Sequence, residues 1–544
     1  MPIETSTPTL PPSTPDAAPA PAARSRRLRP ASFWWLPAAV AFALLRLPSF
    51  LEPHWYTDEA GYASTGREIL SGKLPYSEIW NNKPPLHLVT AGAVVKLFGS
   101  SETALHLVTF LTGAVALAAM AYMSRRLLGT WKAATALLAA AVLLGFPFVD
   151  AELMIPESVL IAPVAWAAAI IVVRLHQRRI DGWLWAALAG MLAALALGYQ
   201  QTAIADVGAF GLILLVHPAA RRRHILAYVA AVVAVTAAWV VPLLVLVRPG
   251  TLWFALAGFY VTPDYNYSTS PGAHGLPLAI LLVAVVAAAV GGAVLARRRG
   301  VSHPGWMFAV WAVATLCVPA AAQQPFPHFL APAVIPCALT LAAILPSRRP
   351  SWRPIAAIRA NRAGLLTAVP LAASLVAAGL LARSAGLDWI PAAASLGSNG
   401  YRNLETYYPG AWQAATGGHS WSEWEAEFDL RAPADTATAE WLLAHGFRGA
   451  RAVVWSSDAW PYLLADLPVL LPTAPIYNNE VLLGSNGEVT NRVRALRPAI
   501  ILAESDDLAN YPEIEVLLKS DYREVFSSTV DHVMLRDDLS VPTD

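Results

Sequence analysis

Residues 54–88 read HWYTDEAGYASTGREILSGKLPYSEIWNNKPPLHL, and this polar stretch closely follows an apolar run over residues 33–50. The run is close to the ~20 residues that a helix needs to cross ~30 Å of hydrocarbon. Arginines between Arg24 and Arg29 precede it, and basic residues before a first span hold the N-terminus in the cytoplasm. We therefore expect residues 51–101 to form the first outer loop of a membrane protein.

The composition agrees with a membrane protein. The chain is 56% hydrophobic and 14% charged, whereas soluble domains carry about 25% charged residues. The net charge of +1 gives no overall field that would attract nucleic acid, so no nucleic-acid partner is predicted. Residues 1–30 are rich in Pro, Ala, Ser and Thr, which predicts a disordered cytoplasmic tail.

Basic clusters between the apolar stretches set the predicted topology, because such clusters should lie in the cytoplasm. Residues 86–98 are apolar but short, and we interpret them as a helix at the outer interface. A span there would move every later basic cluster outside. The predicted fold is an α-helical polytopic membrane protein with about eleven transmembrane helices. The predicted spans are residues 33–50, 102–123, 131–148, 158–174, 183–199, 203–217, 224–247, 277–296, 305–322, 327–345 and 363–383.

The composition changes at about residue 385, where the apolar runs shorten and acidic residues appear. We interpret residues 31–385 as the transmembrane catalytic domain and residues 386–544 as an α/β domain on the extracytoplasmic side. Periodicity predicts its elements. Strands are expected at 451–455, 498–503 and in a pair over 521–537, and helices at 434–445 and 487–496.

The first outer loop holds the residues best suited to chemistry. Asp58 and Glu59 are adjacent carboxylates near a membrane surface, which is costly unless they bind a cation, accept a proton or remain hydrated. Lys83 precedes two prolines that restrict the backbone, and its ammonium suits a lipid-linked phosphate. For the acidic pair alone, an ordinary hydrated loop remains the alternative.

The order of motifs in this loop resembles the GT-C glycosyltransferases, especially the lipid A aminoarabinose transferases and the relatives of protein O-mannosyltransferases. A second similar segment, residues 327–330, enters a late span as Pro-His-Phe-Leu. The resemblance covers about residues 33–345 and gives little support to the rest. In the first loop, the matching residues are Asp58, Glu59, Gly72, Leu74, Pro75, Tyr76, Lys83, Pro84, Pro85 and Leu86.

The resemblance implies roles for individual residues. Asp58 takes the place of the essential catalytic acid, with Glu59 beside it, and Lys83 takes the place of the lysine near the carrier phosphate. A second acidic residue is expected in the outer loop before the fourth span. Glu157 fits this position best, and the rivals in the same loop are Asp150 and Glu152.

Further polar residues complete the predicted site. Asn82 stands where some relatives carry an acid that helps to hold a metal, so no cofactor is assigned and a divalent cation stays open. Arg46 is interpreted either as reaching to the interface or as a ligand of the donor phosphate. His328 is either a second phosphate ligand or a satisfied interface histidine, and Asp206 is either functional or held by a buried hydrogen bond. The other predicted pocket residues are Tyr62, Tyr76, Gln200 and Gln201.

The sequence has no Gly-rich phosphate loop, so a nucleotide-sugar donor is not expected. We predict an inverting transfer of a monosaccharide from a polyprenyl-phosphate carrier to a glycan, lipid or protein of the cell envelope. The enzyme would lie in the lipid bilayer of a bacterial inner membrane. One alternative is a transporter or flippase of lipid-linked sugars, whose ionisable groups should lie near mid-membrane. Another is a non-catalytic anchor for the C-terminal domain.

Overall fold

The computed structural model describes residues 33–261, parts of 283–298, 303–321, 326–345 and 404–542. The predicted tail at residues 1–30, the predicted span at 363–383 and most of the one at 277–296 lie outside these residues.

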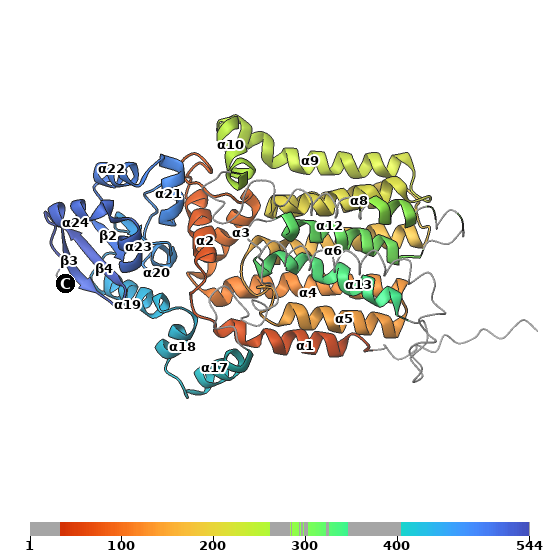
Figure 1. Ribbon diagram of the computed structural model, residues 1–544, viewed down its shortest axis with the longest axis horizontal. Helices are drawn as coiled ribbons and strands as arrows, with labels where there is room; N and C mark the ends of the chain where they lie inside the picture. The colour runs from red at the N-terminus through yellow and green to blue at the C-terminus, as the bar shows by residue number, and fades with distance from the viewer. Residues whose placement is uncertain are drawn as a thin grey trace, which may run out of the picture. The chain divides into compact units, whose positions relative to one another are not determined.

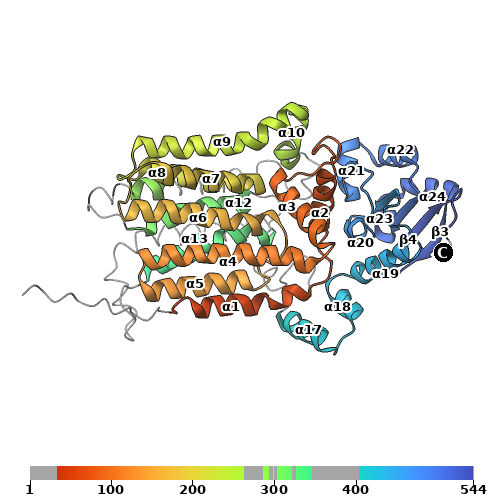
Figure 2. The same cartoon turned by 180° about the vertical axis from the view of Figure 1, so that it is seen from behind.

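Long apolar helices run side by side, as Figures 1 and 2 show. Among the described residues, four helical stretches are long and apolar enough to cross a membrane: α4 (Glu102–Leu127), α6 (Pro156–His176), α9 (Arg222–Leu246) and Pro327–Ile344. The last consists of η5 (Pro327–Ala333) and α13 (Val334–Ile344). Shorter apolar helices are α1 (Leu36–Arg46) with η1 (Leu47–Leu51), α5 (Thr130–Gly145), α7 (Leu184–Tyr199), η2 (Gln201–Ala203) with α8 (Ile204–Val216), and α12 (Gly305–Ala321).

Each predicted span that falls wholly within the described residues coincides with one of these helices. The total of eleven stays a prediction. Helix α6 occupies the interior of the bundle, since 78% of its most apolar window is buried, whereas only 6% of the α9 window is buried. Most of α9 is therefore available to lipid, which its apolar side chains favour.

The first loop folds into two short helices that cross at very close range. They are α2 (Thr57–Leu70) and α3 (Pro85–Phe98), and α3 corresponds to the helix predicted at residues 86–98. Gly66 of α2 faces Gly92 of α3 with no side chain between the two backbones. A Cβ atom added at Gly92 would lie 2.2 Å from the Gly66 carbonyl carbon. Glycine at both positions therefore allows this packing.

Residues 404–542, here called the C-terminal region, combine helices with a four-stranded sheet of strand order β1-β2-β4-β3. β1 and β2 are parallel, and β4 is antiparallel to both β2 and β3. The predicted helices and strands are found in this part of the chain. The elements are α17 (Leu404–Thr416), α18 (Trp421–Phe428), α19 (Arg431–Ala444), β1 (Ala452–Trp455), α20 (Trp460–Leu464), α21 (Ile476–Leu483), α22 (Asn486–Leu496), β2 (Ile500–Glu504), α23 (Ser505–Asn510), η6 (Pro512–Ile514), α24 (Glu515–Asp521), β3 (Tyr522–Ser527) and β4 (Asp531–Arg536).

The hydrophobic core of the C-terminal region is continuous with that of the first loop. Trp55, Tyr62 and Ala63 belong to the same buried cluster as Trp424 and Trp460. Burial of apolar area is the main favourable term in such packing. One face of α2 and α3 is therefore stabilised by residues that lie far away in the sequence.

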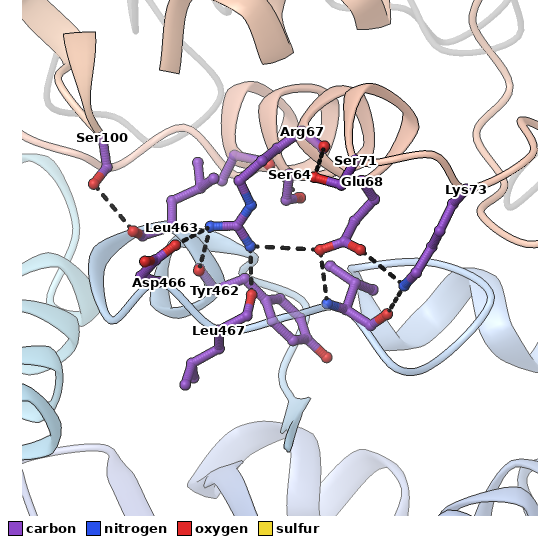
Figure 3. A network of polar contacts seen from close by, with 12 residues as sticks. Ser64, Arg67, Glu68, Ser71, Lys73, Ser100, Tyr462, Leu463, Asp466 and Leu467 are labelled. Carbon is purple, nitrogen blue, oxygen red and sulfur yellow. Dashed lines mark hydrogen bonds and ion pairs between the residues drawn. The ribbon is translucent and has the colours of Figure 1, made fainter. Parts of the chain in front are cut away.

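Polar contacts reinforce this junction, as Figure 3 shows. Arg67 donates to the carbonyl oxygen of Tyr462 over 3.1 Å and also to that of Leu467. Glu68 accepts the backbone N–H of Val469 over 3.1 Å and pairs with Lys73 at 2.9 Å. The charged side chains that point from α2 towards the C-terminal region thus form hydrogen bonds with backbone groups of that region. Such satisfaction is what makes their burial tolerable.

The close crossing leads to a prediction for Gly92→Ala. The added methyl group meets backbone atoms that cannot rotate away, so we expect a loss of about 1–3 kcal/mol and a lower Tm in detergent. Gly208→Ala is the matched control because Gly208 is also helical and its Cβ would have nothing within 4 Å. That control should be neutral or slightly stabilising. Equal melting of Gly92→Ala and wild type would contradict the crossing.

Candidate active site

A cavity of about 340 Å³ lies where α2, the segment before α3, η5 and the C-terminal region meet. Its walls carry one carboxylate, one ammonium and one imidazole among aromatic and amide side chains. The lining residues are Tyr56, Asp58, Gly61, Tyr62, Asn81, Asn82, Lys83, Phe259, Phe326, His328, Phe329, Pro475, Tyr477, Asn478 and Val481.

Asp58 is half-buried in the first turn of α2, where the helix dipole favours a negative charge. Tyr62 lies one turn later and donates its hydroxyl to the Asp58 carboxylate over 3.0 Å. Burial, followed by the nearby Asp58 charge, raises the pKa of Tyr62 well above its ordinary value. Tyr62 therefore remains a protonated donor, and it holds one Asp58 oxygen while the carboxylate lines the cavity.

Lys83 places its ammonium on the same cavity. Its Nζ lies 3.4 Å from the Tyr260 hydroxyl and 5.8 Å from the ring centres of Tyr62 and Tyr260. Two aromatic faces thus stabilise the cation. The Tyr76 hydroxyl donates to the carbonyl oxygen of Lys83 over 2.8 Å, so Tyr76 supports the lysine backbone from behind. Tyr76 itself is not among the residues that line the cavity.

The two predicted glutamines connect the cavity wall to neighbouring loops. Gln201 donates to the carbonyl oxygen of Asn82 over 3.1 Å, and Tyr260 donates to the same oxygen over 3.1 Å. Gln200 donates to the Glu157 carboxylate over 2.6 Å. Glu157 is buried in the first turn of α6 and does not line the cavity, although its charge raises the pKa of Tyr62 and Tyr260 as a minor cause after burial.

His328 reaches the cavity from η5 and pairs with Asp150, which was an alternative to Glu157 as the second acidic residue. Its Nδ1 lies 3.4 Å from Asp150 Oδ2, and its ring stacks on Phe326. Asp150 adopts a left-handed backbone conformation with φ of 49°, which is uncommon for residues other than glycine. The Ser158 hydroxyl donates to the Asp150 carbonyl oxygen and fixes this turn. Asp150 therefore orients the imidazole from outside the cavity.

The structure places Glu59 away from the cavity. Its side chain is 1% exposed, and its Oε1 accepts the backbone N–H of Met154. The same oxygen lies 3.4 Å from His106 Nε2 of α4. Glu59 thus fastens α2 to the segment that leads into α6 instead of facing the space that Asp58 lines.

Two further polar residues also lie outside the cavity. Arg46 is 1% exposed at the end of α1, and it donates to the Thr109 hydroxyl over 2.8 Å. Asp206 accepts hydrogen bonds from Trp311 over 2.7 Å and from Thr315 over 3.3 Å, which matches its interpretation as a hydrogen-bonded buried acid. Across the described part of the chain, no group of three His, Cys, Asp or Glu side chains is arranged to hold a metal ion.

Comparisons with known proteins bear on the fold of the chain. Residues 82–246 match the family model described as dolichyl-phosphate-mannose-protein mannosyltransferase. The fold is similar to that of ArnT from Cupriavidus metallidurans bound to undecaprenyl phosphate, with 18% identity, a TM-score of 0.59, and coverage of 94% of this chain and 100% of that one. The chain therefore shares the fold of this ArnT.

Two other solved structures are also similar to this chain. The apo form of the same ArnT has 17% identity and a TM-score of 0.57, and the match covers 92% of this chain and 97% of that one. The apo oligosaccharyltransferase of Archaeoglobus fulgidus has 13% identity and a TM-score of 0.44, with coverage of 94% and 75%. No curated protein sequence matches the chain.

The sequence does not indicate the part of the cavity wall that lies after residue 470. Pro475, Tyr477 and Asn478 belong to no recognisable motif, so the sequence around them gives no signal of a site. Tyr260 belongs to a group of aromatic residues before residue 277, which the sequence allows to be either an aromatic interface belt or a wall for the prenyl chain or a platform for a sugar. The signal that could have separated it from that belt is its contact with Lys83, which is a tertiary property.

The position of Glu59 leads to a prediction about stability. Glu59→Ala removes the acceptor of the Met154 N–H and the partner of His106, and each buried group left unsatisfied costs about 1–3 kcal/mol. We expect a clearly lower Tm for this variant. Glu59→Gln keeps an oxygen acceptor at the same place and should lose less. Unfolding is measured by differential scanning fluorimetry in detergent, and a wild-type Tm for Glu59→Ala would contradict the anchoring role.

Proposed function

We propose that this chain transfers a monosaccharide from a polyprenyl-phosphate carrier to an acceptor hydroxyl of a cell-envelope glycan, lipid or protein. The observation that carries the proposal is the presence of Asp58 and Lys83 in one cavity of about 340 Å³. A carboxylate that accepts a proton and an ammonium that neutralises a phosphate are the two groups that this reaction requires. The likeness to an ArnT bound to undecaprenyl phosphate supports the same donor class.

The proposed reaction is a single displacement. The Asp58 carboxylate accepts the proton of the acceptor hydroxyl, and the acceptor oxygen forms a bond to the anomeric carbon. The bond between that carbon and the phosphate oxygen breaks with its electron pair, which leaves a polyprenyl phosphate beside Lys83. Because the acceptor attacks opposite to the leaving phosphate, the anomeric configuration is inverted. Tyr62 holds the second Asp58 oxygen in place during the transfer.

We further propose that the enzyme lies in the bacterial inner membrane with its N-terminus in the cytoplasm and the C-terminal region outside. The ends of several apolar helices support a site at one membrane face: Gln200 follows α7, Glu157 begins α6, and His328 lies in η5. A transporter should instead carry ionisable groups at mid-membrane. Asp206, the acid within α8, is held by Trp311 and Thr315, which favours the enzyme.

The test of the catalytic step is Asp58→Asn. This change keeps the shape and the contact with Tyr62 but removes the proton acceptor, so kcat should fall by about 10²- to 10⁴-fold. Transfer is measured with radiolabelled undecaprenyl-phosphate sugars and an envelope extract. The Tm should stay close to that of wild type, in contrast to Glu59→Ala. Near-normal turnover of Asp58→Asn would refute the assignment of the base.

The test of the donor site is a comparison of Lys83→Met with Lys83→Arg. Methionine preserves much of the length but removes the charge, so binding of undecaprenyl phosphate should weaken by about 10- to 100-fold, as expected for a hydrogen bond to a charged group. Arginine keeps the charge and should retain most of the affinity. Affinity is measured by microscale thermophoresis in detergent. Equal affinity of Lys83→Met and wild type would show that Lys83 does not bind the donor phosphate.

A further inference from the structure

The cavity has a wall that belongs to the C-terminal region. Pro475, Tyr477, Asn478 and Val481 line it together with residues of the first loop, although more than 390 residues separate Lys83 from Asn478 in the sequence. Tyr477 and Asn478 are half-buried in the first turn of α21. The described structure gives the Asn478 amide no hydrogen-bond partner. An amide with two donors and an acceptor is thus available to a molecule in the cavity.

This wall is held firmly by its own hydrogen bonds. Asn479 is 0% exposed and fixes the turn before α21, because its amide donates to the carbonyl oxygens of Thr473 and Pro475 and accepts the Thr473 N–H. The Ile476 N–H donates to the carbonyl oxygen of Ser456, which follows β1. The neighbours of Asn479 are therefore presented from a rigid support, which specific recognition requires.

The wall is also fixed relative to Asp58. The Trp80 N–H donates to the carbonyl oxygen of Pro472 over 2.7 Å. Pro475 rests on Gly61, where an added Cβ would lie 3.5 Å from its ring. Gly61 lies three residues after Asp58, on the next part of the same helix. The segment around Tyr477 thus has a fixed position beside Asp58, the proposed base.

The side chains of this wall determine which kind of molecule it can bind. The side chains it adds are a phenol and a neutral amide, which pair with hydroxyl groups that both donate and accept, while the tyrosine ring offers an apolar face to a sugar ring. The prenyl chain of the donor must remain in the hydrocarbon among the long helices. The C-terminal region lies across α2 from α3. The part of the cavity wall that it supplies is therefore suited to the acceptor.

We propose that Tyr477 and Asn478 bind the sugar of a carbohydrate acceptor in the cavity lined by Asp58. This inference rests on the proposed function, since it assigns the acceptor side of the same reaction. It also narrows the acceptor to a glycan or the glycan part of a glycolipid. Asn479 is a positioning residue for the two, because it shapes the turn but does not line the cavity.

The experiment compares Tyr477→Ala and Asn478→Ala with Glu480→Ala in the full-length protein. Glu480 lies in the same helix but does not line the cavity, so it is the matched control. The probes are a radiolabelled undecaprenyl-phosphate sugar and a detergent extract of the cell envelope. We expect each cavity variant to raise the amount of extract needed for half-maximal transfer by about tenfold, as loss of one or two good hydrogen bonds implies. Binding of undecaprenyl phosphate and the Tm should not change.

The outcomes distinguish failure of the proposed transfer reaction from failure of the proposed acceptor site. If wild type transfers no sugar from any of the radiolabelled undecaprenyl-phosphate sugars, the proposed function and this inference are both wrong. If wild type is active but the cavity variants saturate with the extract like Glu480→Ala, this inference alone is wrong. Weaker binding of undecaprenyl phosphate in the variants would assign the wall to the donor and also overturn it. A labelled product that protease digestion removes would overturn the choice of carbohydrate.

Discussion

The hydrogen bond from the Met154 backbone to the Glu59 carboxylate fixes the first turn of α2 against the segment that leads into α6. Successive residues of a helix point about 100° apart because a turn contains about 3.6 residues. When Glu59 is held in the protein interior, Asp58 must therefore face another direction, and that direction is the cavity. The acidic pair thus divides its tasks: one carboxylate anchors the helix, and its neighbour is presented to substrate.

The remaining parts of the cavity depend on the same helix. α2 packs against α3 through Gly66, and the segment just before α3 carries Lys83. Gly61 of α2 contacts Pro475, and Arg67 and Glu68 of the same helix bind the backbone of the C-terminal region. A carboxylate, an ammonium and an amide from three parts of the chain are therefore positioned with respect to one short helix. Rigid placement of this kind is where an enzyme gains most from its fold.

Much of this architecture could be predicted from local sequence. The apolar runs gave the helices of the bundle, and the alternation of short strands and helices gave β1, α22 and β2. Asp58 and Lys83 could be selected because their motifs are local, and they line one cavity. Which face of α2 is buried could not be predicted, so Glu59 was grouped with Asp58. That choice depends on His106 and Met154, which lie in other helices and loops. For the same reason no pattern connected Tyr477 with the first loop.

The junction between the first loop and the C-terminal region has a consequence for biosynthesis. The Val469 N–H and the Glu68 carboxylate that accepts it are 401 residues apart in the sequence, and contacts of such long range form late because closing a long loop costs entropy. Ribosomes deliver the first loop early and the residues of the C-terminal region that line the cavity near the end of translation. Until then, the apolar face that α2 and α3 share with Trp424 and Trp460 stays uncovered. A nascent chain is thus expected to depend on chaperones at the membrane surface, and it cannot enclose a substrate before its synthesis is almost complete.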